Sequence, residues 1–360
     1  MLKPIEFTNI TGWTEDDLDS ALKAFHLSAT EILENGHSFK RDARLGGTRE
    51  DWVPVCEIAS KATDAHTFFE KHFLALRVHD QERPEGLFTG YYEPETQGSL
   101  TQSKEYCVPI YAKPDDLVSF TKFNSQSSGF TYGRLENGKA VGFYTRQQIE
   151  DGALAGRGLE ICYVKSWVDA FFIHVQGNGR VMLEDGRTIR LSYAAKNGRV
   201  YTSIGSVLMS RGIGTPESMS MQFLREWMVK NPSHMRDLLW SNDSFVFFRG
   251  TQIDDPHLGA IGAGKVNLTP RRSLAVDRTN WMFGTPLFID THEPNEAKSG
   301  PIPFRHLMIG QDTGTAIRGL VRGDVYWGWG DTAAHNAGHM KSKGAMTALL
   351  PKTLAHRLLQ

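Results

Sequence analysis

The stretch LMIGQDTGTAIRGLVRGDVYWGWGD, residues 307–331, places acidic side chains among glycines, aromatic residues and two arginines. The apolar run 307–309 and the β-branched and aromatic run 324–329 are bounded by glycine, which predicts two short strands. Acids at the ends of such strands and in their turns are held by a rigid sheet, where binding or catalytic roles are common. The acidic residues of the stretch are Asp312, Asp324 and Asp331.

Asp324 has the surroundings that a proton-donating carboxyl group needs. It follows Gly323 and precedes the apolar and aromatic run 325–327, and such neighbours exclude water and raise the pKa of a carboxyl group. A raised pKa keeps the acid protonated near neutral pH, as general acid catalysis requires. The alternative is a structural acid in a glycine turn, which is the commoner role of such residues.

Two further acids of the stretch have alternative roles. Asp312 is either a second carboxyl group whose charge raises the pKa of Asp324, or an ionised turn residue that accepts backbone N–H bonds, because Asp-Thr-Gly is also an ordinary turn sequence. Asp331, which is followed by Thr332 and two alanines, is expected to cap a short helix.

Asp277 ends an apolar strand and is the remaining candidate acid. Its alternative role is a salt bridge with Arg278 or Arg271. Basic residues gather in this third of the chain, where they face either the carboxylates of a ligand or solvent. They are Lys265, Arg271, Arg272, Arg278, Arg318 and Arg322.

The composition is that of an ordinary globular protein. Of 360 residues, 40% are apolar and 22% are charged, and the formal net charge of -1 gives no electrostatic case for nucleic-acid binding. The length favours two domains, or one domain with an insertion. Cys56, Cys107 and Cys162 form no CxxC pair, so they indicate neither a zinc site nor a redox motif, and at most one disulfide bond can form.

Several motifs with known chemistry are absent or incomplete. The segment GAIGAGK, residues 259–265, lacks the hydroxyl residue of a phosphate-binding loop. His335 and His339 have the spacing of metal ligands, but no glutamate completes the motif, and no GxSxG nucleophile is present. We therefore expect neither a metal nor a cofactor. No run of 18 apolar residues exists, and the first residues resemble neither a signal peptide nor a lipid-acceptor site.

Periodicity and turn residues predict a mainly β chain with helices at its N-terminal end. Helical spacing and capping signals predict helices at 14–34, 55–62, 65–75 and 216–240. After residue 84, short β-rich runs are found at 106–112, 170–175, 180–183 and 188–192. Asn-Gly and Asp-Gly pairs predict hairpin turns at 137–138, 185–186 and 197–198.

Three motifs follow one another along two segments of the chain. The first segment, LTPRRSLAVDRTNWMFGTPLFID (268–290), contains an AVD motif. The second, HLMIGQDTGTAIRGLVRGDVYWGWGDTA (306–333), contains a QDTGxAIxG motif and then an acid in the following strand. This order resembles the three-aspartate domain of the membrane-bound lytic transglycosylase A family, whose aspartates match Asp277, Asp312 and Asp324. Further segments look like family blocks: FTGYYEPE (88–95), FYTRQQI (143–149), FFIHVQGNGRVMLEDG (171–186), NGRVYTSIG (197–205) and FFR (247–249).

The resemblance implies a double-psi β-barrel domain made of residues 1–95 and 245–360, which includes the N-terminal helices. Residues 96–244 are then an inserted, smaller β domain, with a glycan groove between the two domains. The implied location is the periplasm. Association with the outer membrane would require an anchor that the given chain lacks, and the resemblance leaves the oligomeric state open.

Members of the family cleave the β-1,4 bond between N-acetylmuramic acid and N-acetylglucosamine in peptidoglycan without water and leave a 1,6-anhydromuramoyl end. By motif position, Asp324 is implied as the catalytic acid and then base, with Asp312 beside it and Asp277 as a supporting residue. The related barrels of expansins and family 45 endoglucanases carry their acid in a His-Phe-Asp strand. Here Arg322 and Gly323 replace His-Phe, which leaves the neighbours of the acid undetermined.

Peptidoglycan glycan strands are the implied partner. Residues expected to line the groove have aromatic faces that suit sugar rings, or polar groups that suit hydroxyl and acetamido groups. They are Tyr91, Tyr92, Glu93, Gln176, Asn178, Thr202 and Ser203. Two other functions remain open from the sequence: a non-catalytic glycan-binding protein similar to expansins, and a muramidase that hydrolyses the same bond.

Overall fold

The computed structural model describes residues 1–360 except 81–84, 121–131, 217, 254, 256 and 296–301. The chain forms two compact units, unit 1 (Met1–Tyr92 and His257–Gln360) and unit 2 (Glu93–Pro256), so that unit 2 is inserted into the sequence of unit 1. The sequence placed the divisions at 95/96 and 244/245. The second division lies later because β12 (Val246–Gln252) pairs with β11 (Thr188–Lys196) of unit 2.

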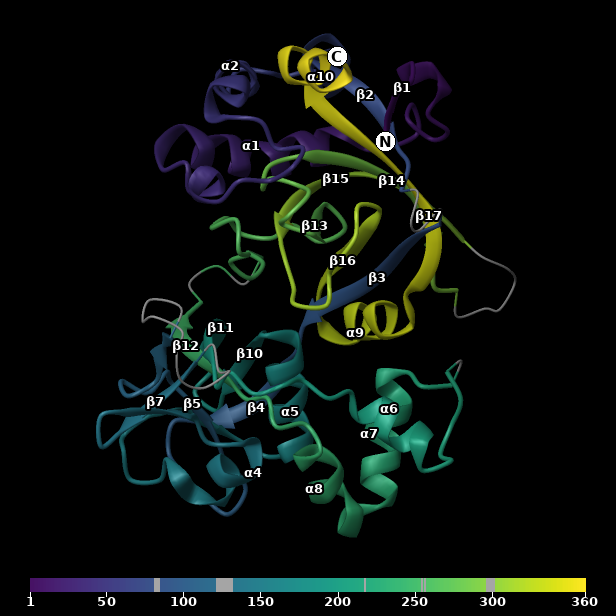
Figure 1. Ribbon diagram of the computed structural model, residues 1–360. Coiled ribbons are helices and arrows are strands. Elements are labelled where there is room, and N and C mark those ends of the chain that lie inside the picture. Colours follow the sequence, from purple (N-terminus) through teal and green to yellow (C-terminus); the bar gives the residue numbers. More distant parts are fainter. Residues whose placement is uncertain (81–84, 121–131, 217, 254, 256, 296–301) are drawn as a thin grey trace. The chain divides into compact units, whose positions relative to one another are not determined.

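Unit 1 contains a closed six-stranded barrel. Its strands pair in the order β17-β14-β15-β13-β16-β3, and β3 pairs with β17 to close the ring, as Figure 1 shows. Closure leaves these six strands without a free edge. The expectation of a mainly β chain with a barrel is therefore confirmed. The strands are β3 (Gly86–Glu93), β13 (Ser273–Val276), β14 (Pro286–Glu293), β15 (Ile302–Asp312), β16 (Arg322–Trp329) and β17 (Lys341–Pro351).

Helices cover part of the barrel, and two further strands extend its sheet from β17. In Figure 1, α1, α2 and α10 gather beside β2 and β15, and α9 lies against β16 and β3. Between these helices and the sheet lies a core that includes Phe25, Phe68, Phe69 and Phe73, none of them more than 3% exposed. The elements are β1 (Leu2–Pro4), α1 (Leu18–Glu34), α2 (Arg49–Ala59), α3 (Ala65–His72), β2 (Phe73–Val78), α9 (Gly330–His339) and α10 (Lys352–Leu359).

The first predicted helix begins later than its sequence suggests. Asp17, and not Thr14, is the N-cap, because its carboxylate accepts a bond from the N–H of Ser20 at 3.1 Å. The preceding acid, Asp16, is turned inward instead. Its two oxygens accept bonds from both terminal nitrogens of Arg272 at 2.9 Å, from His306 Nδ1 at 2.7 Å and from the N–H of Leu307 at 2.7 Å. This buried carboxylate fixes the N-terminal segment to β15.

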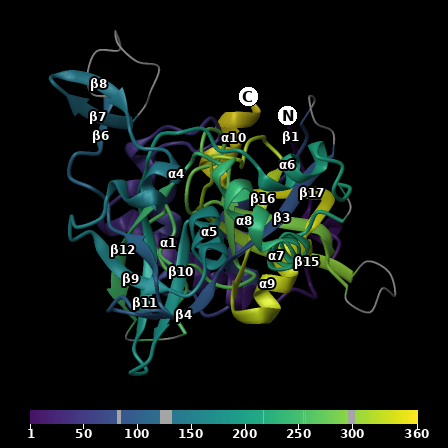
Figure 2. The same ribbon diagram turned by 90° about the horizontal axis from the view of Figure 1, so that it is seen from below.

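Unit 2 contains a six-stranded sheet in the order β12-β11-β10-β4-β9-β5 and a three-stranded sheet β6-β7-β8, whose strands lie side by side in Figure 2. The hairpin turns predicted at 137–138 and 185–186 are confirmed, and Asn137, Gly138 and Gly186 have φ of 49°, 75° and 84°. The pair at 197–198 follows the end of β11 and joins no hairpin. The strands are β4 (Glu95–Ser99), β5 (Val108–Tyr111), β6 (Val118–Ser119), β7 (Tyr132–Glu136), β8 (Lys139–Gly142), β9 (Glu160–Val164) and β10 (Asn178–Leu183).

The expected strand at 170–175 is wrong, because this segment lies in α5 (Trp167–Gln176). Ser166 caps the helix by accepting bonds from the N–H groups of Val168 and Asp169, and Gly177 ends it with φ of 73°. The helix packs on the sheet and is buried on most sides, so its apolar run shows no clear helical period. The other helices of this unit are α4 (Arg146–Gln148), α6 (Ile204–Ser210), α7 (Met221–Lys230) and α8 (Pro232–Trp240).

The three cysteines are free thiols. Burial raises the pKa of Cys56 and of Cys162 to about 12, so both are uncharged at neutral pH. Within the described ranges, the model contains no helix with the length and apolar character needed to cross a bilayer.

Candidate active site

The barrel brings Asp312 and Asp324 to the same face of its sheet. Ala275 of β13 is paired on one side with Asp312 of β15 and on the other with Asp324 of β16. Directly paired residues point to the same face, and adjacent strands are about 4.8 Å apart, so the two Asp backbones are separated by about 10 Å. The Ala275 side chain is 4% exposed and packs in a buried cluster with Tyr91 and Tyr326.

Asp324 is held by a hydrogen-bonded chain of two residues. The hydroxyl group of Thr89, on β3, donates to Oδ1 of Asp324, and Arg322 donates to the Thr89 oxygen at 2.8 Å. Burial raises the pKa of Asp324, and the charge of Asp312 adds to the rise, while the Thr89 bond and the charge of Arg322 oppose it. Oδ2 of Asp324 has no hydrogen-bond partner among the described residues, so this oxygen can carry a proton for transfer.

Asp312 accepts three hydrogen bonds. Tyr91 Oη donates to Oδ2 at 2.9 Å, and the backbone N–H groups of Ala263 and Thr313 donate to Oδ1, also at 2.9 Å. Burial raises the pKa of Asp312, and these three bonds oppose the rise because they favour the charged form. Asp312 thus fixes a loop through these backbone bonds, and its charge adds to the rise that burial causes in the pKa of Asp324.

Asp277 lies just beyond β13 and organises the loops around the acids. Its carboxylate accepts bonds from the N–H of Thr279 at 3.0 Å, from the Thr279 hydroxyl at 2.7 Å and from the N–H of Gly319 at 2.8 Å. Burial opposes ionisation, but these bonds and the charge of Arg318 outweigh it and lower the pKa of Asp277. Asp277 thus joins its own turn to the loop that leads into β16.

The expected ion pairs of Asp277 are wrong. Arg278 donates instead to the backbone carbonyls of Ser38, Arg41 and Trp281. Arg271 pairs with Glu293 at 2.7 Å. The basic residue nearest to the Asp277 carboxylate is Arg318, at 3.5 Å.

Strand β3 supplies one partner to each acid. Thr89 and Tyr91 are two positions apart, and alternate residues of a strand point to the same face. Tyr91 was expected to contact a glycan, but it is only 8% exposed and its hydroxyl group is occupied by Asp312. Thr89 was not predicted as a site residue, although it lies in the FTGYYEPE segment and has the same strand parity as Tyr91.

Glu93 does not line a groove, and this expectation is corrected. The residue is 0% exposed, Oε2 accepts a bond from Arg180 Nε at 2.8 Å, and Oε1 accepts one from Arg190 Nε at 2.9 Å. The carboxylate therefore anchors β10 and β11 at the start of unit 2. Its neighbour Tyr92 is 4% exposed, so little of its ring is open to a ligand.

The remaining candidates lie in unit 2. Gln176 is partly exposed at the end of α5, and Asn178 is 8% exposed, with an Oδ1 that has no partner among the described residues. Thr202 donates its N–H to Asn242 Oδ1 at 3.1 Å, and Ser203 caps α6. Contact of these residues with a glycan remains a prediction.

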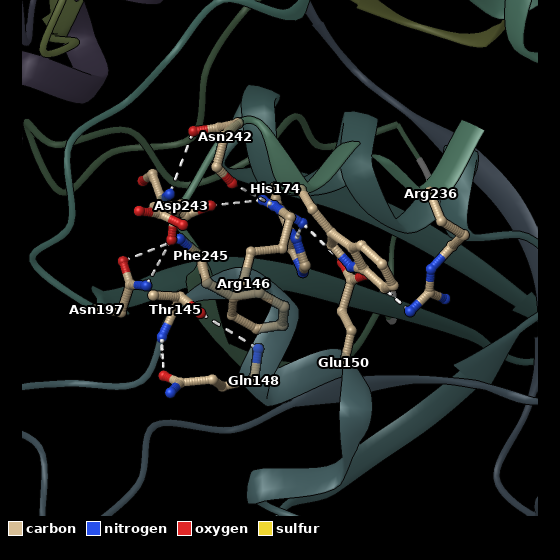
Figure 3. A network of polar contacts seen from close by, with 12 residues as sticks. Thr145, Arg146, Gln148, Glu150, His174, Asn197, Arg236, Asn242, Asp243 and Phe245 are labelled. Carbon is tan, nitrogen blue, oxygen red and sulfur yellow. Dashed lines mark hydrogen bonds and ion pairs between the residues drawn. The ribbon is translucent and has the colours of Figure 1, made fainter. Parts of the chain in front are cut away.

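A buried polar network holds the segment that carries Thr202 (Figure 3). Arg146 donates to the carbonyl of Asn242 at 3.0 Å, to Glu150 at 3.2 Å and to Nδ1 of His174 at 3.0 Å. Burial, then the Arg146 charge, holds the pKa of His174 well below its usual range, so His174 is neutral and accepts this bond. Every partner is internal, which indicates a structural role.

The expectation that Asp331 caps a helix is wrong. It lies in the first turn of α9, after the cap position at Trp329, where its charge still suits the helix N-terminus. His335 and His339 lie on the same helix, and His339 Nδ1 is 2.8 Å from the His335 carbonyl. Among the residues that the structure describes, no three His, Cys, Asp or Glu side chains are grouped to hold a metal ion.

Family models match two parts of the chain. A model described as the MltA specific insert domain matches residues 87–249, and one described as the 3D domain matches residues 272–350. The membrane-bound lytic murein transglycosylase A of Vibrio cholerae is 34% identical over 267 residues, and that of Escherichia coli K12 is 35% identical over 266 residues. Each match covers 73% of this chain and 65% of the relative, so the chain spans just under two thirds of their length.

Solved structures match nearly the whole chain. The membrane-bound lytic murein transglycosylase from Agrobacterium tumefaciens superimposes with a TM-score of 0.87 at 34% identity and covers 99% of both chains. MltA from Neisseria gonorrhoeae gives 0.80 at 30% identity, covering 97% of this chain and 92% of its own. E. coli MltA with bound chitohexaose gives 0.71 at 28% identity, covering 98% and 91%.

Proposed function

This chain belongs to the membrane-bound lytic murein transglycosylase A family, and on that premise we propose that it is a peptidoglycan lytic transglycosylase. The observation that carries the proposal is the arrangement of Asp312 and Asp324 on either side of Ala275, on one face of the barrel. The names of the relatives and the chitohexaose bound to one of them support a glycan as the ligand.

Asp324 acts first as an acid in the proposed reaction. With its pKa raised by burial, it holds a proton on Oδ2 and transfers it to the glycosidic oxygen between N-acetylmuramic acid and N-acetylglucosamine. The C1–O bond breaks, N-acetylglucosamine leaves with the proton, and positive charge develops at C1 of the muramic acid. The Asp324 carboxylate then stands next to this charge.

Asp324 acts next as a base. It takes the proton of the C6 hydroxyl group of the same muramic acid, and the C6 oxygen bonds to C1 to give the 1,6-anhydro end. A hydrolase with two carboxylates must position a water molecule or form a covalent intermediate. Here the nucleophile belongs to the substrate, so proximity replaces a second reactant and one acid suffices.

Asp312 supports this cycle without transferring a proton. Its three hydrogen-bond donors favour the carboxylate form, and its negative charge helps to keep Asp324 protonated. Asp277 keeps the loop before β16 in place. For the location we propose the periplasm, since peptidoglycan lies there and the named relatives are membrane-bound.

The test is the chemistry of the products. Purified peptidoglycan is incubated with the protein, and the released muropeptides are identified by mass spectrometry. Anhydro-muropeptides are expected. Products that carry one additional water would show a muramidase, and binding without any release would show a glycan-binding protein. The Asp324→Asn variant, prepared in parallel, excludes a contaminating enzyme as the source.

A further inference from the structure

The neighbours of Asp324 leave one arginine without a role in the proposed reaction. Arg322 precedes the acid by two residues on β16, so both side chains start from the same face of that strand. A permanent positive charge beside an acid that must stay protonated opposes that protonation. Burial raises the pKa of Asp324, and the charge of Arg322 works against this rise. Because Arg322 disfavours the protonated form of Asp324, its position beside the acid needs another explanation.

The guanidinium group of Arg322 is fixed to two strands. One terminal nitrogen donates to the carbonyl of Gly323 and lies 3.4 Å from that of Leu87, and the other donates to Oγ1 of Thr89 at 2.8 Å. A planar group held at both terminal nitrogens has little freedom to rotate. Its N–H to Thr89 therefore has a defined direction.

The direction of this bond determines the direction of the next one. Arginine has donors and no acceptor, so the Thr89 oxygen must accept from Arg322. The single hydroxyl hydrogen of Thr89 is then available only for Asp324 Oδ1. Because Oδ1 accepts this bond, a proton on Asp324 is placed on Oδ2, which has no partner among the described residues.

We propose that Arg322 is a positioning residue that acts through Thr89 to hold Oδ1 of Asp324 as an acceptor, so that Oδ2 carries the transferred proton. The proposal rests on Asp324 being the acid of the proposed function. The same chain stabilises the carboxylate that forms after the first transfer, because the Thr89 hydroxyl group and the Arg322 charge both favour the ionised form. The hydrogen bonds from Arg322 to Thr89 and from Thr89 to Asp324 thus position the proton of the acid form and stabilise the base form.

Kinetics on purified peptidoglycan separate positioning from binding. Thr89→Val removes the hydroxyl group with little change of shape, and we expect kcat to fall more than about 10-fold with KM nearly unchanged, since only the transition state is affected. Thr89→Ser keeps the hydroxyl group and should stay within about 3-fold of the wild type. Arg322→Met should lower kcat, and should lower it little further in the Thr89→Val background. Arg305→Met, on β15 and remote from the acids, is the matched control for loss of an arginine.

A readout without substrate keeps the proposal separate from the proposed function. In protein labelled with ¹³C at aspartate carboxyl groups, the Asp324 signal is assigned from its loss in Asp324→Asn and followed by NMR through a pH titration. Arg322→Met should raise the pKa of Asp324, and the alkaline limb of the rate profile should move to higher pH with it. An unchanged titration, or equal losses of kcat from Arg322→Met with and without Thr89, would overturn the proposal. If the wild type releases no anhydro product but the titration shifts, only the proposed function fails.

Discussion

Replacing each of the two acids by asparagine should separate catalysis from stability. Asp324 accepts one hydrogen bond, from Thr89, and asparagine can accept the same bond through Oδ1. We expect Asp324→Asn to keep its free energy of unfolding within about 1 kcal/mol of the wild type. Loss of the proposed proton donor and acceptor should lower the rate of anhydro-muropeptide release by roughly 10³-fold or more.

Asp312→Asn should behave in the opposite way. One oxygen of the new amide can serve the N–H groups of Ala263 and Thr313, but its NH₂ group then faces Tyr91, whose buried hydroxyl group loses its acceptor. An unsatisfied buried donor costs about 1–3 kcal/mol. Unit 1 contains roughly 200 residues, for which each kcal/mol lowers Tm by about 2–4 °C, so a fall of about 2–12 °C is expected.

The two measurements are made on the same preparations. Thermal unfolding followed by circular dichroism gives Tm, and timed release of anhydro-muropeptides gives the rate. Residual activity of Asp324→Asn close to that of the wild type, with loss in Asp312→Asn at unchanged Tm, would refute the assignment of the acid. A large fall in Tm for Asp324→Asn would instead show that its side chain has structural contacts beyond Thr89.

Three further predictions follow from the same contacts. The rate of the wild type should fall as pH rises through the raised pKa of Asp324, because the protonated form is required. Asp312→Asn should move this fall to lower pH, since it removes a negative charge that raises the pKa of Asp324. An unshifted pH profile would contradict the coupling of the two acids. Asp16→Asn should lower the free energy of unfolding by about 3–5 kcal/mol, because it leaves buried Arg272 without its counter-charge. Exposed Asp19→Asn should change the free energy of unfolding by less than about 0.5 kcal/mol. Equal urea midpoints for the two variants would exclude a stabilising role of the Asp16–Arg272 pair. Gly323→Ala would place a methyl group 2.9 Å from Leu274 Cδ1 and 3.0 Å from Phe88 Cδ1. We expect this crowding to lower the free energy of unfolding, measured in urea, by about 1–3 kcal/mol. Gly310→Ala, whose methyl group has no neighbour closer than 3.5 Å, should be tolerated.

The sequence predicted those features that depend on local pattern. Apolar and aromatic runs bounded by glycine identified the strands that carry Asp312 and Asp324. The Asn-Gly and Asp-Gly pairs predicted two hairpins correctly. The helix at 170–175 was missed because a helix buried on most sides shows no amphipathic period. Asp331 was taken for a helix cap because capping residues and first-turn acids have the same side-chain preference.

The partners of the acids could not be read from local pattern. Thr89 and Asp324 are 235 residues apart, and only the pairing of β3 with β16 brings them together. Glu93 was predicted to line the groove, and its burial has no local signal because glutamate is mostly exposed in proteins. Its burial depends on two arginines about 90 residues later in the chain.

Strand β3, which closes the barrel, is synthesised long before the strands with which it pairs. Residues 86–93 leave the ribosome early, but their strand pairs with β16 and β17, the latter close to the C-terminus. At roughly 5–20 residues per second, the 235 residues between Thr89 and Asp324 take about 10–50 s to synthesise. Asp312 is added only near the end of that interval and Asp324 at its end, so a chain released early would contain Thr89 and Tyr91 without the carboxyl groups they bind. The proposed activity would thus arise only after β16 and β17 have been synthesised.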